Sequence, residues 1–142
     1  MIDLGALLDD EQDEAWHIDP RDEDPRDEIA RQSAFLRDAK FLCPKVDIFA
    51  VPNAGKRSQW AAGKAKREGM VAGVLDLVAT WPGAGVAFLE WKDGSKMPDD
   101  NQRERLNRYV RQGHHCGVFR QEQSALTFLR DCGAPFLARG DL

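Results

Sequence analysis

The spacing of apolar positions along the chain first predicts a helix. Ile29, Leu36 and Cys43 recur at intervals of seven residues, as expected for one face of a helix, and the next residue is a proline. Asp24 has the side chain of a helix N-cap and precedes a second proline, which suits the first helical position. A helix over residues 25–42 is therefore predicted.

Short runs rich in β-branched and aromatic residues predict strands after this helix. Two such runs, 74–80 and 86–92, are separated by a Pro-Gly segment that favours a hairpin turn. Strands interleaved with helices predict a central mixed β-sheet flanked by helices, an α/β or α+β fold. The expected elements are helix 25–42, strand 46–51, strands 74–80 and 86–92, helix 99–112, strand 115–120 and helix 122–132.

Acidic residues are concentrated at the start of the chain. Residues 1–28 contain 12 Asp and Glu against two Arg, whereas the rest of the chain contains 18 Lys and Arg against 12 Asp and Glu. We expect residues 1–23 to form a mobile acidic arm, which Trp16 could dock, and residues 24–142 to form the folded domain. The arm could be a solvated tail, an inhibitory DNA mimic or a partner-binding segment. The basic body is compatible with DNA or RNA as a partner.

Length and composition exclude several classes of protein. The 142 residues fit one domain, and no apolar run of about 18 residues is present to span a membrane. No basic segment followed by an apolar stretch marks the start for export. Three well-separated cysteines predict neither a disulfide framework nor a zinc site, so a reducing cytoplasm is expected. A phosphate-binding Gly-x-x-x-x-Gly-Lys loop is absent from the sequence, so no nucleotide cofactor is expected.

An acid and a base interrupt the apolar stripe of the strand at 86–92. Because alternate side chains of a strand share a face, Glu90 and Lys92 point the same way, and Asp76 can meet them across the hairpin. Buried charges of this kind are costly unless they are compensated. One interpretation is a structural ion pair in which Lys92 bridges both carboxylates. The other is a divalent cation held by the carboxylates, with Lys92 beside it to position and activate water.

Basic residues gather between the first two predicted strands, around one tryptophan. They fit either a nucleic-acid contact or the solvated surface of a helix. These residues are Lys56, Arg57, Lys64, Lys66 and Arg67.

Further residues accompany the candidate site in a fixed order. They are Glu28 and Gln32, the segment Pro52-Asn53-Ala54-Gly55-Lys56-Arg57, Gly69 and Gly73, Leu75-Asp76-Leu77, Phe88-Leu89-Glu90-Trp91-Lys92, Gln102 and Gly113. Over residues 28 to about 130, this order and spacing resemble the VRR-NUC branch of the PD-(D/E)XK nuclease superfamily. The family's usual proline before the metal-binding aspartate is Leu75 here, which concerns backbone geometry and leaves the catalytic residue types present.

The resemblance implies a restriction-endonuclease-like core and a divalent-metal-dependent DNA endonuclease. Asp76 and Glu90 resemble the ligands of Mg²⁺ or Mn²⁺, with the Trp91 carbonyl as a third oxygen, and Lys92 resembles the catalytic lysine. Glu28 resembles a first-helix acid that contributes to the metal site. Alternatively, Glu28 is an acidic residue that favours the helix dipole.

Other matches also have two interpretations. Gln102 matches a family glutamine that supports the site, or it closes a capping box with Asp99. Gln32 is a second supporting match. Asn53 and Lys56 would hold backbone phosphates together with the other basic residues of that region, or Asn53 simply forms a turn.

The resemblance also suggests a substrate and an assembly. Small members of this family that lack added domains resemble dimeric resolvases, which implies a homodimer that cuts branched DNA such as four-way junctions. A bacterial or phage-infected cell would be its setting. The alternatives are a flap or less selective nicking nuclease, and a non-catalytic DNA-binding module of the same fold.

Overall fold

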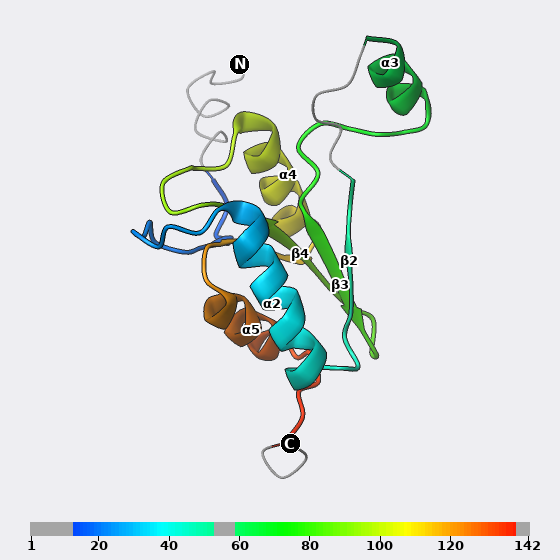
Figure 1. Ribbon diagram of the computed structural model, residues 1–142. Helices are drawn as coiled ribbons and strands as arrows, with labels where there is room; N and C mark the ends of the chain where they lie inside the picture. The colour runs from blue at the N-terminus through cyan, green and yellow to red at the C-terminus, as the bar shows by residue number, and fades with distance from the viewer. Residues whose placement is uncertain (1–12, 53–58, 139–142) are drawn as a thin grey trace, which may run out of the picture.

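The computed structural model describes residues 13–52 and 59–138. Within them, the strands form one mixed sheet in the order β1-β5-β4-β3-β2, with helices on both faces (Figure 1). This architecture confirms the predicted mixed α/β fold. The elements are β1 (His17–Ile18), α2 (Glu28–Leu42), β2 (Asp47–Ala50), α3 (Gln59–Arg67), β3 (Leu77–Trp81), β4 (Gly85–Trp91), α4 (Asp100–Arg111), β5 (His115–Phe119) and α5 (Glu122–Asp131).

The strands β3 and β4 form the antiparallel hairpin that the sequence predicts. Their register pairs Leu77 with Leu89 and Trp81 with Gly85. The edge strand β2 pairs antiparallel with β3, and β5 pairs parallel with β4 on the other side. The hairpin therefore lies inside the sheet, where both of its outer edges are covered.

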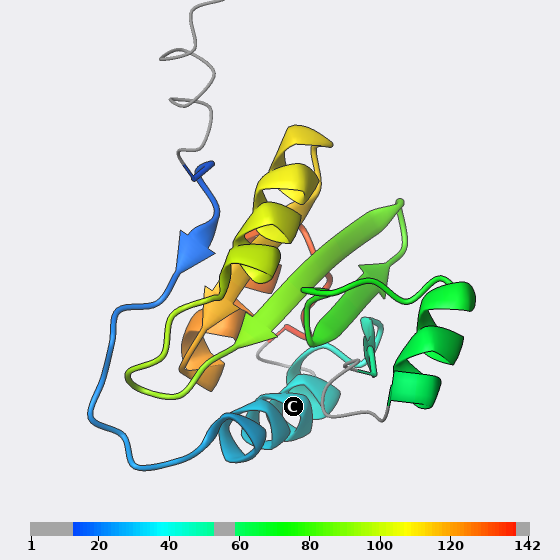
Figure 2. The same cartoon turned by 90° about the horizontal axis from the view of Figure 1, so that it is seen from above.

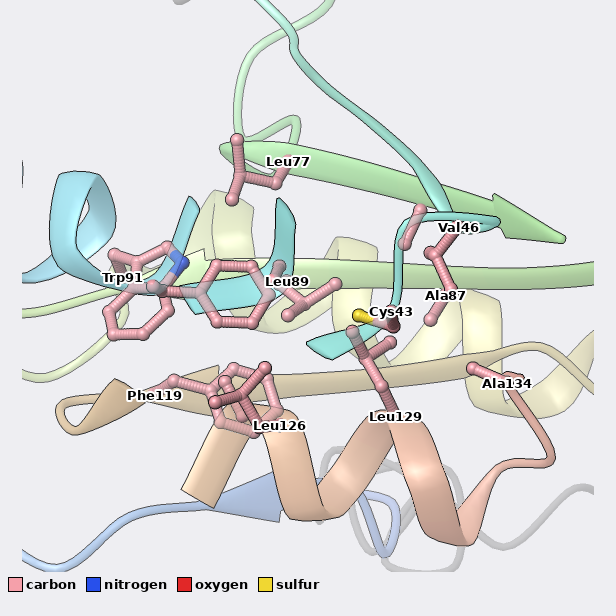
Figure 3. Packing of buried hydrophobic residues seen from close by; sticks show 14 residues of the cluster. Cys43, Val46, Leu77, Ala87, Leu89, Trp91, Phe119, Leu126, Leu129 and Ala134 are labelled. Carbon is pink, nitrogen blue, oxygen red and sulfur yellow. The ribbon is translucent and has the colours of Figure 1, made fainter. Parts of the chain in front are cut away.

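The two faces of the sheet have separate cores. Helices α2 and α5 cover one face, where Leu89 and Trp91 pack with residues of both helices (Figure 3). Helix α4 covers the other face and contributes Leu106 to a smaller cluster (Figure 2). Since side chains alternate along β4, Glu90 points to the α4 face between two residues that point to the larger core. None of the helices in the described ranges is long and apolar enough to cross a membrane.

Helix α2 begins at Glu28, three residues later than predicted. Asp27 is its N-cap, because its side chain accepts the Ala30 N–H at 2.8 Å. The expected cap, Asp24, instead pairs with the Arg26 guanidinium at 2.8 Å. Because that carboxylate is already engaged by a neighbour, the extended chain continues to Asp27 before the helix starts.

Part of the predicted acidic arm is tied to the folded domain. β1 pairs with β5 at the edge of the sheet, and the Trp16 indole N–H donates to Asn107 Oδ1 at 2.8 Å. Asp22 pairs with the buried Arg31 at 2.8 Å. Residues 13–23 of the expected acidic arm therefore contact the domain through its arginines and polar groups, and the mobility of the arm stays a prediction. Residues 1–12 lie outside the described part.

Candidate functional site

Two carboxylates meet where the hairpin opens toward the preceding loop. Asp76 directly precedes β3, and continuing the register beyond Leu77 and Leu89 places it opposite Glu90. The Asp76 backbone N–H donates to Glu90 Oε2 at 3.2 Å, and Asp76 Oδ2 accepts the Trp91 N–H at 2.8 Å. The structure thus brings together the two acids that the sequence placed on facing strands.

Lys92 lies beside this carboxylate pair. Its Nζ is 3.6 Å from Glu90 Oε1, and the two side chains are 10% and 2% exposed. The Lys92 backbone N–H donates to the Phe119 carbonyl of β5 at 3.0 Å, which fixes the end of the strand. The ammonium therefore faces Glu90 in a largely enclosed position, where charges interact more strongly than in water.

The negative charge of the pair is only partly compensated. Burial, followed by the proximity of Asp76, raises the pKa of Glu90 to about 9, although Lys92 acts in the opposite direction. Burial also raises the pKa of Asp76. A structural ion pair in the same protein behaves differently, because hydrogen bonding to Arg31 holds the pKa of Asp22 well below its usual value. Both carboxyl groups thus resist being ionised together beside a single ammonium, and a bound cation would supply the positive charge that favours the doubly ionised pair.

Helix α4 orients a side chain onto Glu90. Asp99 and Gln102 form a capping box, with backbone-to-side-chain hydrogen bonds of 2.8 and 3.0 Å. The remaining amide group of Gln102, Nε2, donates to Glu90 Oε1 at 2.7 Å. Both interpretations of Gln102 therefore hold for its contacts: it closes the cap, and the cap aims its carboxamide at the site.

The backbone of Trp91 offers another oxygen on the same side. In an extended strand, the N–H and C=O of one residue point to the same edge. Since the Trp91 N–H donates to Asp76, its carbonyl is also directed toward the Asp76 side, whereas the Lys92 N–H turns to β5. Two carboxylates and a carbonyl are the kind of donors that hard divalent cations such as Mg²⁺ prefer.

The structure does not join Glu28 or Gln32 to this pair. No hydrogen bond links either residue to Asp76 or Glu90 within residues 13–52 and 59–138. In the same ranges, no three His, Cys, Asp or Glu side chains are grouped so as to hold a metal ion. Glu28 lies in the first turn of α2, where a carboxylate favours the helix dipole, so its position agrees with that alternative.

The predicted DNA contacts divide into two groups. Asn53, Lys56 and Arg57 lie outside the described residues. Lys64, Lys66 and Arg67 are exposed on α3, which stands beyond the end of the sheet (Figure 1). Lys64 is 3.5 Å from Glu68 in an exposed pair, which leaves the basic side of this helix largely in solvent.

Two fully buried arginines near the site were not predicted. Arg120 donates to the carbonyls of Asp93 and Lys96 at 2.9 and 2.6 Å, and so holds the chain that leaves Lys92. Arg31 anchors the segment before α2. Nothing in the local pattern distinguishes these arginines from surface ones. The one sequence feature that could have indicated them is the excess of acidic residues in the first 28 positions, because these residues need basic partners.

Comparison with models of known protein families, with curated proteins and with solved structures gives no match for this chain. What the protein does is therefore inferred from its own residues and their geometry. The strongest feature for that purpose is the carboxylate pair with its adjacent lysine.

Proposed function

We propose that the protein is a divalent-metal-dependent endonuclease that hydrolyses phosphodiester bonds of DNA, with a PD-(D/E)XK-type site on a restriction-endonuclease-like core. The observation that carries this proposal is the meeting of Asp76, Glu90 and Lys92 at the end of the central hairpin. The resemblance of the surrounding motifs to VRR-NUC nucleases assigns the active site to the same three residues. A mixed sheet with helices on both faces is compatible with such a core.

The donor set fits a hard cation. Asp76, Glu90 and the Trp91 carbonyl are the groups that would hold Mg²⁺ or Mn²⁺, and their incomplete compensation by Lys92 favours added positive charge. When bound, such a cation neutralises charge that develops on the phosphate and makes water a better nucleophile. Gln102 keeps Glu90 oriented by donating to one of its oxygens.

Lys92 is assigned the role of orienting the attacking water and stabilising charge on the phosphate. Hydrolysis requires in-line attack of water on phosphorus, with loss of a proton from that water to the solvent, cleavage of the bond to the leaving oxygen and uptake of a proton by that oxygen. The Lys92 ammonium, held within 3.6 Å of Glu90, can orient the attacking water or stabilise the charged phosphate oxygens. Its enclosed position strengthens this interaction relative to one in bulk water.

We further propose that the enzyme acts as a homodimer on branched DNA such as four-way junctions. A single domain of this size presents a limited surface to DNA. A two-fold dimer doubles that surface and places one site against each of two strands.

Cleavage of a panel of labelled DNAs tests the proposed function. A four-way junction, a 5′ flap, a splayed arm, a plain duplex and a single strand would each be incubated with Mg²⁺, Mn²⁺ or EDTA. We expect metal-dependent cutting of the junction and no cutting in EDTA. Preference for the flap, or equal cutting of all duplexes, would change the substrate class while keeping the reaction. Tight binding without cutting of any substrate would replace the endonuclease by a non-catalytic DNA-binding module.

A further inference from the structure

Acidic residues before β1 cover one side of α4. This side carries Arg103 and Arg111 and is called the arginine face. Arg103 lies 2.9 Å from Asp13, and Arg111 lies 3.0 Å from Glu14. Between them, Asn107 Oδ1 accepts the Glu14 backbone N–H at 2.8 Å. Positions 103, 107 and 111 are four residues apart and share one side of the helix. Residues 13–16 therefore follow that side, and Figure 2 shows β1 and the short blue segment just before it beside α4.

The arginines of this face remain accessible despite their partners. The side chains of Arg103 and Arg111 are 44% and 52% exposed. Ion pairs with this much solvent around them add little net stability. The acidic partners can therefore be exchanged for another anion without loss of the fold.

The arginine face starts in the turn of α4 that also carries Gln102. Gln102, whose carboxamide contacts Glu90 at 2.7 Å, precedes Arg103 in the chain but points to a different side of the helix. Arg111 lies eight residues further along the helix, a distance of about 12 Å. A nucleic-acid strand that runs along the arginine side of α4 would meet both guanidinium groups in succession.

We propose that Arg103 and Arg111 form a binding surface for the phosphodiester backbone, and that the acidic segment at residues 13–16 occupies this surface as an internal competitor. Carboxylates present arginine with the same kind of charge-assisted acceptor as phosphate oxygens. Trp16 is tied to Asn107, so the competing carboxylates are held at a high effective concentration. The inference rests on the proposed function for the identity of the polyanion.

Binding measured without cleavage tests this inference. The full chain would be titrated into a fluorescein-labelled 30-base-pair duplex in EDTA, with fluorescence anisotropy as the readout. Asp13→Asn/Glu14→Gln keeps side-chain size but removes both charges. It should lower Kd about threefold to tenfold at 50 mM salt, and less at 200 mM. The control, Asp38→Asn/Asp47→Asn, makes the same change in net charge at exposed positions on α2 and β2.

Arginine variants separate the α4 face from a general charge effect. Arg103→Gln/Arg111→Gln should weaken binding more in the Asp13→Asn/Glu14→Gln background than in the parent, because the parent arginines are already occupied. The gain from removing the two acids should disappear when both arginines are absent. A gain no larger than that of the control, or one that persists without the arginines, would overturn the inference. Urea unfolding of each variant confirms that the fold is kept.

The two proposals can fail separately. A protein that binds DNA through Arg103 and Arg111 in EDTA but cuts nothing with Mg²⁺ would contradict the endonuclease and keep the arginine surface. If the protein cuts DNA but its affinity for DNA does not change when Asp13, Glu14, Arg103 and Arg111 are substituted, the endonuclease is supported and the arginine surface is contradicted.

Discussion

Burial at the candidate site strongly shifts the ionisation of Glu90. Its side chain is almost fully buried, faces Asp76 and Lys92, and accepts a hydrogen bond from Gln102. In the folded protein its pKa is raised from 4.5 to about 9. Folding without a cation thus keeps a proton on Glu90 at neutral pH, whereas the unfolded chain releases it.

This difference makes the stability of the metal-free protein depend on pH. Between about pH 4.5 and pH 9 the folded state binds one proton more at Glu90, so the free energy of unfolding falls as pH rises. Glu90→Gln has no such proton to lose. In EDTA at pH 8 it should be more stable than the parent by about 1–3 kcal/mol, and the difference should vanish near pH 4. Urea unfolding at several pH values measures this, and parallel pH profiles would contradict it.

At the scale of single residues, the contacts of the candidate site could be predicted where they depend only on the alternation of side chains along a strand. The strand alternation that placed Glu90 and Lys92 on one face also predicted their meeting with Asp76. For Gln102 the sequence left a supporting role and a capping role open, because its contact with Glu90 depends on how α4 lies over the sheet. Arg120 was not predicted, because its partners are backbone carbonyls from distant segments.

Among the elements, the loop before β3 passes against the start of α4. Gly73 has φ of +78°, and a Cβ at this position would lie 2.4 Å from the Asn101 carbonyl carbon and oxygen. Gly69 also has positive φ, +93°, but a Cβ there would meet nothing within 4 Å. The missing side chain of Gly73 therefore lets the segment that bears Asp76, just before β3, approach the helix that bears Gln102.

Alanine at these two glycines should have unequal effects. Both substitutions place a side chain at positive φ, which costs about 1 kcal/mol. Gly73→Ala additionally forces the loop away from the Asn101 backbone, which adds about 1–3 kcal/mol. Urea unfolding should thus show the larger loss for Gly73→Ala, with Gly69→Ala as the control. Equal losses would show that the close approach contributes nothing.

Element boundaries followed the sequence where capping is local and departed from it elsewhere. Asp99 caps α4, as one of the two interpretations of Gln102 expected, since its partner is three residues away. Asp24 lost that role in α2 to Asp27 because Arg26 engages it. β1 was missed because two residues carry no periodic signal, and its formation depends on pairing with β5.

For the whole molecule, cation binding should be coupled to stability. A cation that binds the folded site and not the unfolded chain stabilises the domain by mass action. Millimolar Mn²⁺ should raise the Tm of the parent by several degrees, and Asp76→Asn should remove most of that rise. Asp38→Asn, an exposed change on α2, should behave as the parent does. A rise of the same size in Asp76→Asn would place the cation elsewhere.

The proposed homodimer is a second property of the whole molecule. Light scattering at micromolar protein should give about twice the 16.0 kDa mass of the chain. A monomer under these conditions would count against a resolvase that cuts two strands, while leaving the catalytic residues in place. The mixed α/β fold was predictable from alternating elements, but an assembly depends on surface complementarity that such patterns do not encode.

Cleavage rates of site variants test the central claim most directly. The preferred DNA of the panel would be cut with Mg²⁺ by the parent, Asp76→Asn, Lys92→Gln and the control Asp38→Asn, after each variant is shown to fold. We expect Asp38→Asn to match the parent, Lys92→Gln to be slower by about 100-fold or more, and Asp76→Asn to show no metal-dependent cutting. Cutting by Asp76→Asn and Lys92→Gln at the parent's rate would mean that these residues do not form the active site.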